Sequence, residues 1–183
     1  MKVERTTVKT EAVFSEDKQF RFLLYREWDK TKKHALILSI SPSEHSGISS
    51  DLTTMLVQNN VHKLEEYGGF SLVNLISAVG VEAKKLKSID GLIGDETDKY
   101  IVEGAKAADI IVLTYGRIAG INKAFTAREA EVLKLLEPYR DKLHYITDIS
   151  GREGGLHPLT PAVRNAWLLQ AYTPPVNPEA KSA

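Results

Sequence analysis

The sequence predicts an α/β fold in which helices cover both faces of a central, mainly parallel sheet of four strands. Four short apolar runs, at 34–40, 70–76, 109–116 and 143–150, are typical of strands that are buried on both faces. Helix-like segments separate these runs, and right-handed crossovers between parallel strands then give a three-layer α/β/α sandwich. The length of 183 residues, 43% of them hydrophobic, suits one compact domain over residues 1–173.

An N-terminal β-hairpin is expected over residues 10–28, ahead of the first apolar run. The segments "TEAVF" and "QFRFLLYREW" flank the turn-like segment "SEDK". Phe20, Phe22 and Leu24 alternate along the second segment, so a strand would place all three side chains on one face. The hairpin is expected in addition to the four strands of the central sheet.

Two helices are expected, one in each of the two intervals between the first three apolar runs. A helix from Asp51 to about Tyr67 has apolar residues at helical intervals, and Gly68 and Gly69 are expected to end it. A second helix is expected over residues 96–108, directly before the third apolar run.

Two more helices are expected in the C-terminal third of the chain. The segment "TAREAEVLKLLEPY" is amphipathic and stops near Pro138. Thr160 is a candidate N-cap and Pro161 a candidate first residue for a last helix that runs to about Tyr172. The polar, proline-containing tail over 174–183 should be disordered.

Composition excludes several classes of function. The chain has 24 Lys and Arg against 24 Asp and Glu, so its overall field does not favour long nucleic acid, and any such contact must use a local patch. The absence of cysteine excludes disulfides, thiolate nucleophiles and cysteine-ligated zinc. The apolar runs are too short to span a bilayer and the N-terminus has no apolar signal core, so we expect a cytoplasmic protein without membrane contact.

The predicted topology places a candidate site at one edge of the sheet. In open α/β sheets, ligands bind beyond the carboxyl ends of the parallel strands. The residues expected at those ends, or in the loops that follow them, are Ser41, Pro42, Ser43, Asn74, Tyr115, Gly116 and His157.

Two of these strand ends allow both a functional and a structural interpretation. Ser43, Glu44 and His45 could line a pocket floor, although Ser and Pro also form ordinary turns. Asn74 lies inside the apolar segment "LVNLI", where an unpaired amide costs about 1–3 kcal/mol. Because an amide donates and accepts hydrogen bonds together, Asn74 could recognise the edge of a base, or it could bond to neighbouring loop backbone.

His157 stands in the segment "GREGGLHPLTPAVRNAW", in which Gly151, Gly154 and Gly155 precede it. The glycines would let the backbone approach a flat ligand, and the following helix N-terminus would favour an anion. No P-loop, Rossmann, H-x-x-x-H or H-E-x-x-H motif is present, so neither a cofactor nor a metal is expected. A hydrolase triad of Ser43, His157 and Asp51 lacks the G-x-S-x-G nucleophile elbow and remains a minor alternative.

The order of these motifs resembles the bacterial and phage family called domain of unknown function 1643. The motifs are "FRFLLYREW", "ILSISPS" with a following "DLTT", "VNLI", "IVLTYG" and "GGLHPL", over roughly residues 20–170. The chain departs from the family pattern at Ser41, where the family usually has Asn, at Glu44, where it has Thr, and at Tyr115, where it has Trp. The resemblance itself implies no established activity.

A more distant resemblance, in architecture and motif order, is to the uracil-DNA glycosylases. It implies that Asn74 reads a base and that His157 stabilises negative charge developing on the base O2. Fold similarity does not carry chemistry by itself. Glycosylases usually place Asp or Asn beside the proline of the first loop to position water, whereas this chain has Ser41, with Glu44 and Asp51 as the nearby carboxylates.

Two functions follow as hypotheses for the pocket at the strand ends. The first is binding of a nucleobase, nucleotide or nucleic acid without ordinary uracil excision, for example by a phage or mobile-element factor. The alternative is a hydrolase of the uracil-DNA glycosylase type that acts on a base or N-glycosidic bond. The departure at Ser41 and the neutral net charge favour binding. If the protein is an enzyme, His157 and Asn74 are the candidate catalytic residues.

Overall fold

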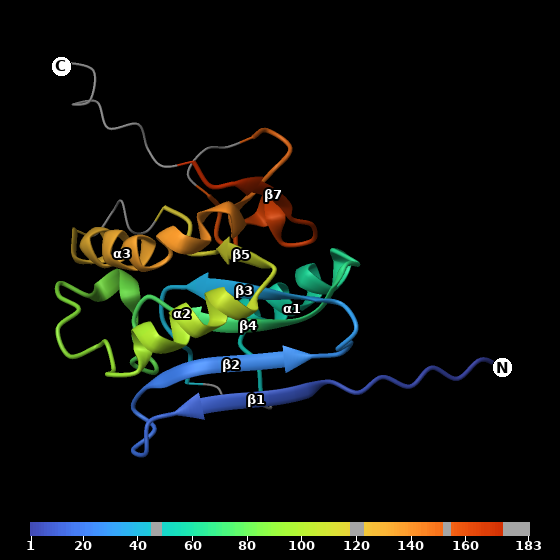
Figure 1. The fold of residues 1–183 in the computed structure, drawn as a ribbon, viewed down its shortest axis with the longest axis horizontal. Coiled ribbons are helices and arrows are strands. Elements are labelled where there is room, and N and C mark those ends of the chain that lie inside the picture. The colour runs from blue at the N-terminus through green and yellow to red at the C-terminus, as the bar shows by residue number, and fades with distance from the viewer. Residues whose placement is uncertain (45–48, 118–122, 152–154, 174–183) are drawn as a thin grey trace.

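The computed structural model describes residues 1–44, 49–117, 123–151 and 155–173, and it has an α/β fold built on one mixed sheet (Figure 1). The predicted α/β class is confirmed. The sheet is larger than the four strands expected, since seven strands pair in the order β1-β2-β4-β3-β5-β6-β7. The strands are β1 (Lys9–Phe14), β2 (Arg21–Glu27), β3 (Lys33–Ser39), β4 (Tyr67–Asn74), β5 (Ile110–Leu113), β6 (Leu143–Thr147) and β7 (Leu168–Ala171).

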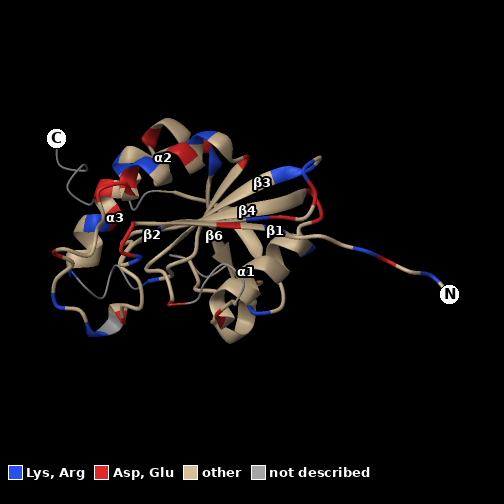
Figure 2. Ribbon diagram, turned by 90° about the horizontal axis from the view of Figure 1, so that it is seen from below, with Lys and Arg blue, Asp and Glu red and all other residues tan. Residues whose placement is uncertain are grey.

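Helices lie on both faces of the sheet. Figures 1 and 2 show α1 on one face and α2 with α3 on the other. One apolar cluster packs α1 against the sheet, and a second packs α2 and α3 against the opposite face. The α-helices are α1 (Leu52–Lys63), α2 (Thr97–Ala107) and α3 (Lys123–Leu135), and the short 3-10 helices are η1 (Ala83–Lys85), η2 (Glu137–Lys142) and η3 (Pro161–Val163).

The expected N-terminal hairpin is present and belongs to the same sheet. Strand β1 pairs antiparallel with β2, and β2 pairs antiparallel with β4. The pairing of β1 with β2 is irregular at the start of β2. Val13 pairs with Leu23 and Phe14 pairs with Arg21, so Phe22 has no partner on β1, as in a β-bulge. The bulge reverses the side-chain alternation, so the face assignment predicted for this segment holds only in part.

Parallel pairing organises the strands that follow. Strand β3 pairs in parallel with both β4 and β5, and β5 pairs in parallel with β6. The last residues of β3 and β4, Ser39 and Asn74, lie directly opposite each other. The loops that leave these strands therefore begin at one common edge of the sheet.

The end of α1 differs from the prediction, because Gly68 and Gly69 do not terminate the helix. Helix α1 ends at Lys63, and both glycines lie inside β4. A Cβ atom on Gly69 would come within 2.6 Å of the Arg26 carbonyl oxygen, and one on Gly68 would come still closer to Asp29. The two glycines are needed for the close approach of β2 and β4.

The helix predicted from Thr160 to Tyr172 is wrong. Only the single 3-10 turn η3 forms there, Thr160 makes no side-chain cap hydrogen bond, and the chain continues as β7. Strand β7 pairs antiparallel with β6, so it uses hydrogen-bonding groups that β6 would otherwise leave unpaired. Val163 and Trp167 are buried in the apolar cluster that also contains residues of α1. The tail predicted to be disordered lies outside the described residues.

Arg128 connects α3 to the end of β4. Its buried guanidinium donates from Nε to the Leu75 carbonyl at 2.8 Å and forms an ion pair with Asp98 on α2. Asp98 and Leu75 thus satisfy a charge that would be costly to bury alone. The bond from Arg128 holds Leu75, the residue that directly follows Asn74 at the end of β4.

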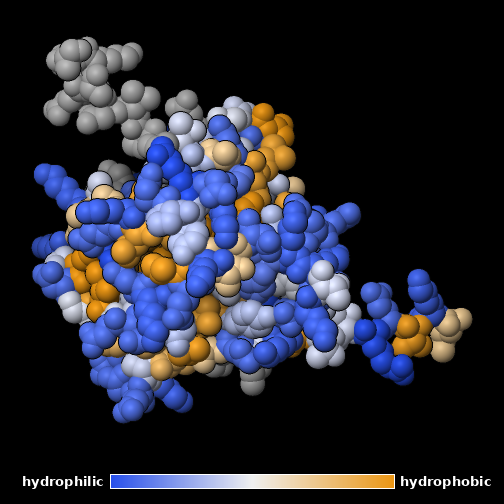
Figure 3. Space-filling view, viewed as in Figure 1, coloured by the Kyte–Doolittle hydropathy of each residue, from blue (hydrophilic) through white to orange (hydrophobic). Residues whose placement is uncertain are grey.

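Polar and apolar side chains are both visible on the surface (Figure 3). The face in Figure 3 is mostly hydrophilic, with hydrophobic side chains visible between polar ones. Among the helices in the described part of the chain, none is long and apolar enough to cross a bilayer.

Candidate ligand-binding site

A cavity of about 920 Å³ lies at the carboxyl edge of the parallel strands. Each of these strands contributes to it through its last residues or through the loop that follows. The lining comprises residues 39–43 after β3, Asn74 of β4, residues 80–83 of the next loop, 115–117 after β5, and Gly155, Leu156, His157, Leu159 and Thr160 after β6, together with Arg21, Leu72, Asp51, Thr53 and Thr54.

The structure brings together all but one of the site residues named from the sequence. Glu44 is the exception, because it is exposed, does not line the cavity, and lies with its side chain over Gly80. His45 and Gly154 lie outside the described residues. The residues that line the cavity as expected from strand order are Ser41, Pro42, Ser43, Asp51, Asn74, Tyr115, Gly116 and His157.

The loop after β3 is held to the loop after β4. The Ser41 hydroxyl donates to the Val81 carbonyl at 3.3 Å, and the Gly80 amide donates to the Pro42 carbonyl at 3.2 Å. The Ser41 proton is therefore directed to backbone, and the serine serves to join two walls of the cavity.

Asp51 caps α1 and is saturated with hydrogen bonds. Its carboxylate accepts from the Ser43 hydroxyl at 2.6 Å and from the amide and hydroxyl of Thr54, each at 2.9 Å. Burial alone favours the neutral acid, but these bonds and one from the Thr53 amide outweigh it and lower the pKa of Asp51. Asp51 is thus an ionised capping group and a weak base.

Asn74 carries a buried amide that the protein leaves unpaired. The residue is only 3% exposed, and its Nδ2 has no hydrogen-bond partner among the described residues. A buried donor in this state costs about 1–3 kcal/mol. Because Asn74 lines the cavity, a ligand that accepts a hydrogen bond would remove that cost.

His157 lines the cavity, and one of its ring nitrogens is bonded to backbone. Its Nδ1 accepts a hydrogen bond from the Leu159 amide at 3.1 Å, so the proton of the neutral imidazole lies on Nε2. Gly116 makes this placement possible: its φ is +63°, and a Cβ there would lie 3.1 Å from the His157 backbone nitrogen. The glycine on one strand end thus lets the histidine loop pack closely over it.

Tyr115 has a different environment from the other strand-end residues. Burial raises the pKa of its phenol well above the ordinary value, and the charge of Glu129 on α3 adds to the effect. Burial also raises the pKa of Glu129. The Tyr115 hydroxyl makes no hydrogen bond to the described residues, and the residue contributes to the cavity mainly as a wall.

Arg21 is a cavity residue that sequence reasoning missed. Its side chain is buried, with 3% of the residue exposed, and it lines the cavity from the start of β2. Burial lowers the pKa of the guanidinium to about 10, with the charge of Asp51 opposing the shift and that of Arg26 adding to it. The sequence signal for this position is an arginine between Phe20 and Phe22. Regular strand alternation would place Arg21 on the face opposite to those two residues, so its burial was not predicted.

One family model matches this chain, over residues 21–159, and its description is protein of unknown function (DUF1643). The chain belongs to this family. The DUF1643 match begins at Arg21 and ends at Leu159, so it includes every cavity residue named above except Thr160. Searches of curated proteins and of solved structures gave no match.

The charged groups of this DUF1643 cavity do not form a metal site. Within the described ranges, no group of three or more His, Asp or Glu side chains is placed to hold a metal ion. The site offers instead an amide, an imidazole and a guanidinium, which recognise polar organic groups and oxyanions.

We predict that Asp51→Ala lowers the free energy of unfolding by about 1–2 kcal/mol at neutral pH, since it removes the cap of α1. The pKa of Asp51 is lowered on folding, so its ionised carboxylate stabilises the protein fully at pH values above the unfolded-state pKa of about 4. This stabilisation is lost as the pH falls through the pKa of the folded state. The thermal midpoints of wild type and variant should therefore converge below about pH 4.

The matched control is Asp95→Ala, which removes an exposed carboxylate. Its thermal midpoint should stay close to that of wild type throughout the titration. A difference between wild type and Asp51→Ala that does not change with pH would contradict the assigned role of the ionised carboxylate.

Proposed function

We propose that this protein binds a ligand containing a nucleobase in the cavity at the strand ends, and that it does so without ordinary uracil excision. The observation that carries the proposal is the unpaired, buried Asn74 amide at the end of β4. Amide side chains recognise base edges because they can donate and accept in one plane.

The size of the cavity supports a small organic ligand. Its volume of about 920 Å³ falls within the range of about 300–1,000 Å³ that is usual for small-molecule sites. The lining combines apolar groups, such as Leu72 and Leu156, with the few polar ones. Such a mixture can cover the faces of a flat ring while Asn74 contacts its edge.

His157 supports recognition of the same kind of ligand. Its Nδ1 accepts from the Leu159 amide, so the proton of the neutral imidazole lies on Nε2. A base carbonyl is a suitable acceptor for this donor. The roles of Asn74 and His157 agree with the resemblance in loop order to the uracil-DNA glycosylases.

The alternative of an N-glycosidic-bond hydrolase requires a carboxylate or equivalent base beside the substrate. Asp51 is the nearest candidate in the cavity, but it accepts three side-chain and backbone hydrogen bonds and its pKa is lowered. Glu44 does not line the cavity, and the Ser41 hydroxyl donates to backbone. A general base needs an accessible lone pair and a pKa near the operating pH, so we favour binding over hydrolysis.

We predict that Asn74→Leu weakens ligand binding without loss of stability. The variant removes an unpaired amide, so its thermal midpoint should equal or exceed that of wild type. Calorimetric titration with nucleobases, nucleosides, nucleotides and short single-stranded oligonucleotides should show binding by wild type, weakened about tenfold or more in Asn74→Leu.

Asn60→Leu is the matched control, because Asn60 is buried on α1 and donates to the Leu56 and Arg164 carbonyls at 2.8 and 3.0 Å. Losing these bonds should lower the thermal midpoint by a few degrees, about 2–4 °C per kcal/mol, and leave the affinity unchanged. Strong destabilisation by Asn74→Leu, or no binding of any compound in the panel by wild type, would refute the proposal.

We predict little or no uracil excision from DNA, for the reasons given for Asp51 and Ser41. The assay uses uracil-containing single- and double-stranded oligonucleotides, with alkali to reveal abasic sites. His157→Ala and Asn74→Ala serve as controls. Strand cleavage by the wild type that both variants abolish would establish the hydrolase alternative, whereas cleavage that survives both substitutions would indicate a contaminating enzyme.

A further inference from the structure

We propose that the ligand is a free mononucleotide and that Arg21 binds its phosphoryl group inside the cavity. This inference rests on the proposed function, because it identifies the chemical class of ligand for the same site. It is carried by a separate residue and a separate observation from those used above, so the two can fail independently.

The Arg21 guanidinium is a buried cation that makes no side-chain hydrogen bond or ion pair with the described residues. Its Nε is buried and makes no hydrogen bond, and no ion pair joins Arg21 to any described carboxylate. Buried charges in proteins are normally paired and hydrogen-bonded, because desolvation is otherwise too costly. Arg21 lines the cavity, so the missing partner is expected to enter there.

The other two buried arginines of the described residues donate side-chain hydrogen bonds to protein acceptors. Arg26 donates to Gln58 at 2.5 Å and to Ser50 at 2.7 Å. Arg128 donates to the Leu75 carbonyl and pairs with Asp98. Since both guanidinium groups use protein acceptors, the state of Arg21 is specific to its position in the cavity wall.

The acidic groups of the cavity form no direct ion pair with Arg21, although the charge of Asp51 acts on it from a distance. The Asp51 carboxylate is engaged by Ser43 and Thr54, and Glu82 forms an exposed ion pair with Lys85 at 2.7 Å. Asp51 also occupies the N-terminus of α1, which removes that helix end as an alternative anion site. A ligand in the cavity can therefore supply the acceptor that Arg21 lacks among the described residues.

An oxyanion is the acceptor that fits a guanidinium best. Phosphate and carboxylate oxygens can accept two parallel hydrogen bonds from arginine, and such bonds are stronger than those between neutral groups. A phosphoryl group on the same molecule as a nucleobase would join the Arg21 contact to the Asn74 contact. A nucleoside monophosphate supplies both groups within one small ligand.

A free nucleotide fits the protein better than a nucleic-acid strand. Nucleic-acid backbones are usually bound by a basic surface, whereas this chain has a formal net charge of zero. Figure 2 shows Lys and Arg mixed with Asp and Glu along α2 and α3, without a single basic face. The cation that lacks a partner lies inside a cavity, where a terminal phosphoryl group can reach it.

The test compares each nucleoside with its 5′-monophosphate by calorimetric titration, using wild type, Arg21→Met and Arg21→Lys. Wild type should bind one monophosphate at least about tenfold more tightly than its nucleoside. Arg21→Met should lose this advantage and keep the nucleoside affinity, while Arg21→Lys should retain part of it. The thermal midpoint of unliganded Arg21→Met should equal or exceed that of wild type, because a buried, unpaired charge is removed.

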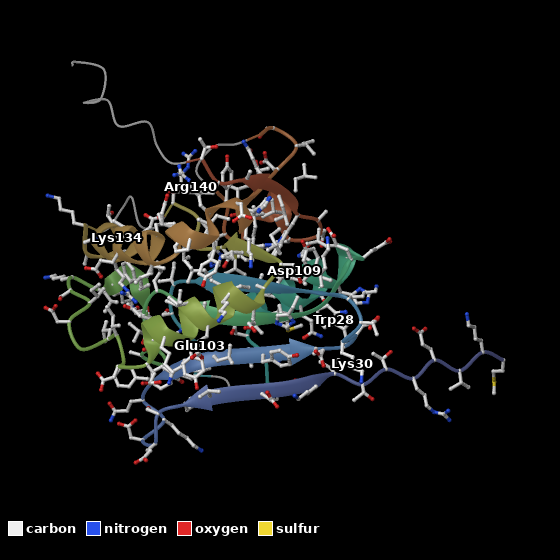
Figure 4. All side chains as sticks on the ribbon, viewed as in Figure 1. Trp28, Lys30, Glu103, Asp109, Lys134 and Arg140 are labelled. Atoms are coloured by element: carbon white, nitrogen blue, oxygen red, sulfur yellow. The ribbon has the colours of Figure 1, made fainter. Side chains whose placement is uncertain are left out.

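Two control variants separate charge loss at this site from charge loss elsewhere. Arg140→Met removes an exposed guanidinium that pairs with Glu137 beyond the end of α3 (Figure 4), and nucleotide affinity should be unchanged. Arg128→Met removes a buried guanidinium that is fully paired, so it should lower the thermal midpoint without changing the preference for monophosphates.

The outcomes distinguish this inference from the proposed function. Equal affinity for nucleosides and monophosphates, unchanged in Arg21→Met, would overturn the phosphoryl site and leave base recognition intact. Inorganic phosphate bound as tightly as any monophosphate, and lost in Arg21→Met, would support the Arg21 site and refute base recognition. Tight binding of a 5′-phosphorylated oligonucleotide, but of no free nucleotide, would overturn the assignment of a free ligand.

Discussion

The parallel pairing of β3 with β4 and β5 is the constraint on which the site depends. It aligns Ser39 with Asn74 and sends the loops that follow to one edge of the sheet. Once these ends share an edge, Gly116 and His157 are brought into contact after β5 and β6. The cavity is thus a consequence of strand direction, and its chemistry depends on the residues that occupy the strand ends.

The polar groups in the cavity wall divide into those that maintain the structure and those left for a ligand. Asp51 and Ser41 make hydrogen bonds that cap α1 and join two loops. Asn74 and Arg21 are buried and leave hydrogen-bonding atoms unused. These unused atoms make the unliganded fold less stable than an apolar wall would. That cost is offset when a ligand supplies the missing acceptors.

The strand-end residues could be predicted from sequence for two reasons. The apolar runs show where the strands lie, and the connection rule for α/β folds gives their direction. The end of α1 and the absence of a C-terminal helix could not be predicted in this way. The conformations of Gly68, Gly69 and residues 168–171 depend on pairing with strands that are distant in sequence, and not on local propensity. Arg21 was missed for a similar reason. The bulge at Phe22 changes the alternation, and a single sequence carries no clear signal for that irregularity.

A crystal structure of the protein with a bound nucleoside 5′-monophosphate tests the central claim most directly. We predict that phosphoryl oxygens lie within hydrogen-bonding distance of the Arg21 guanidinium and that a base edge contacts the Asn74 amide. A nucleotide bound on another surface, with Arg21 and Asn74 in contact only with water, would contradict this prediction. A nucleotide whose base and phosphoryl group touch neither residue would contradict it as well.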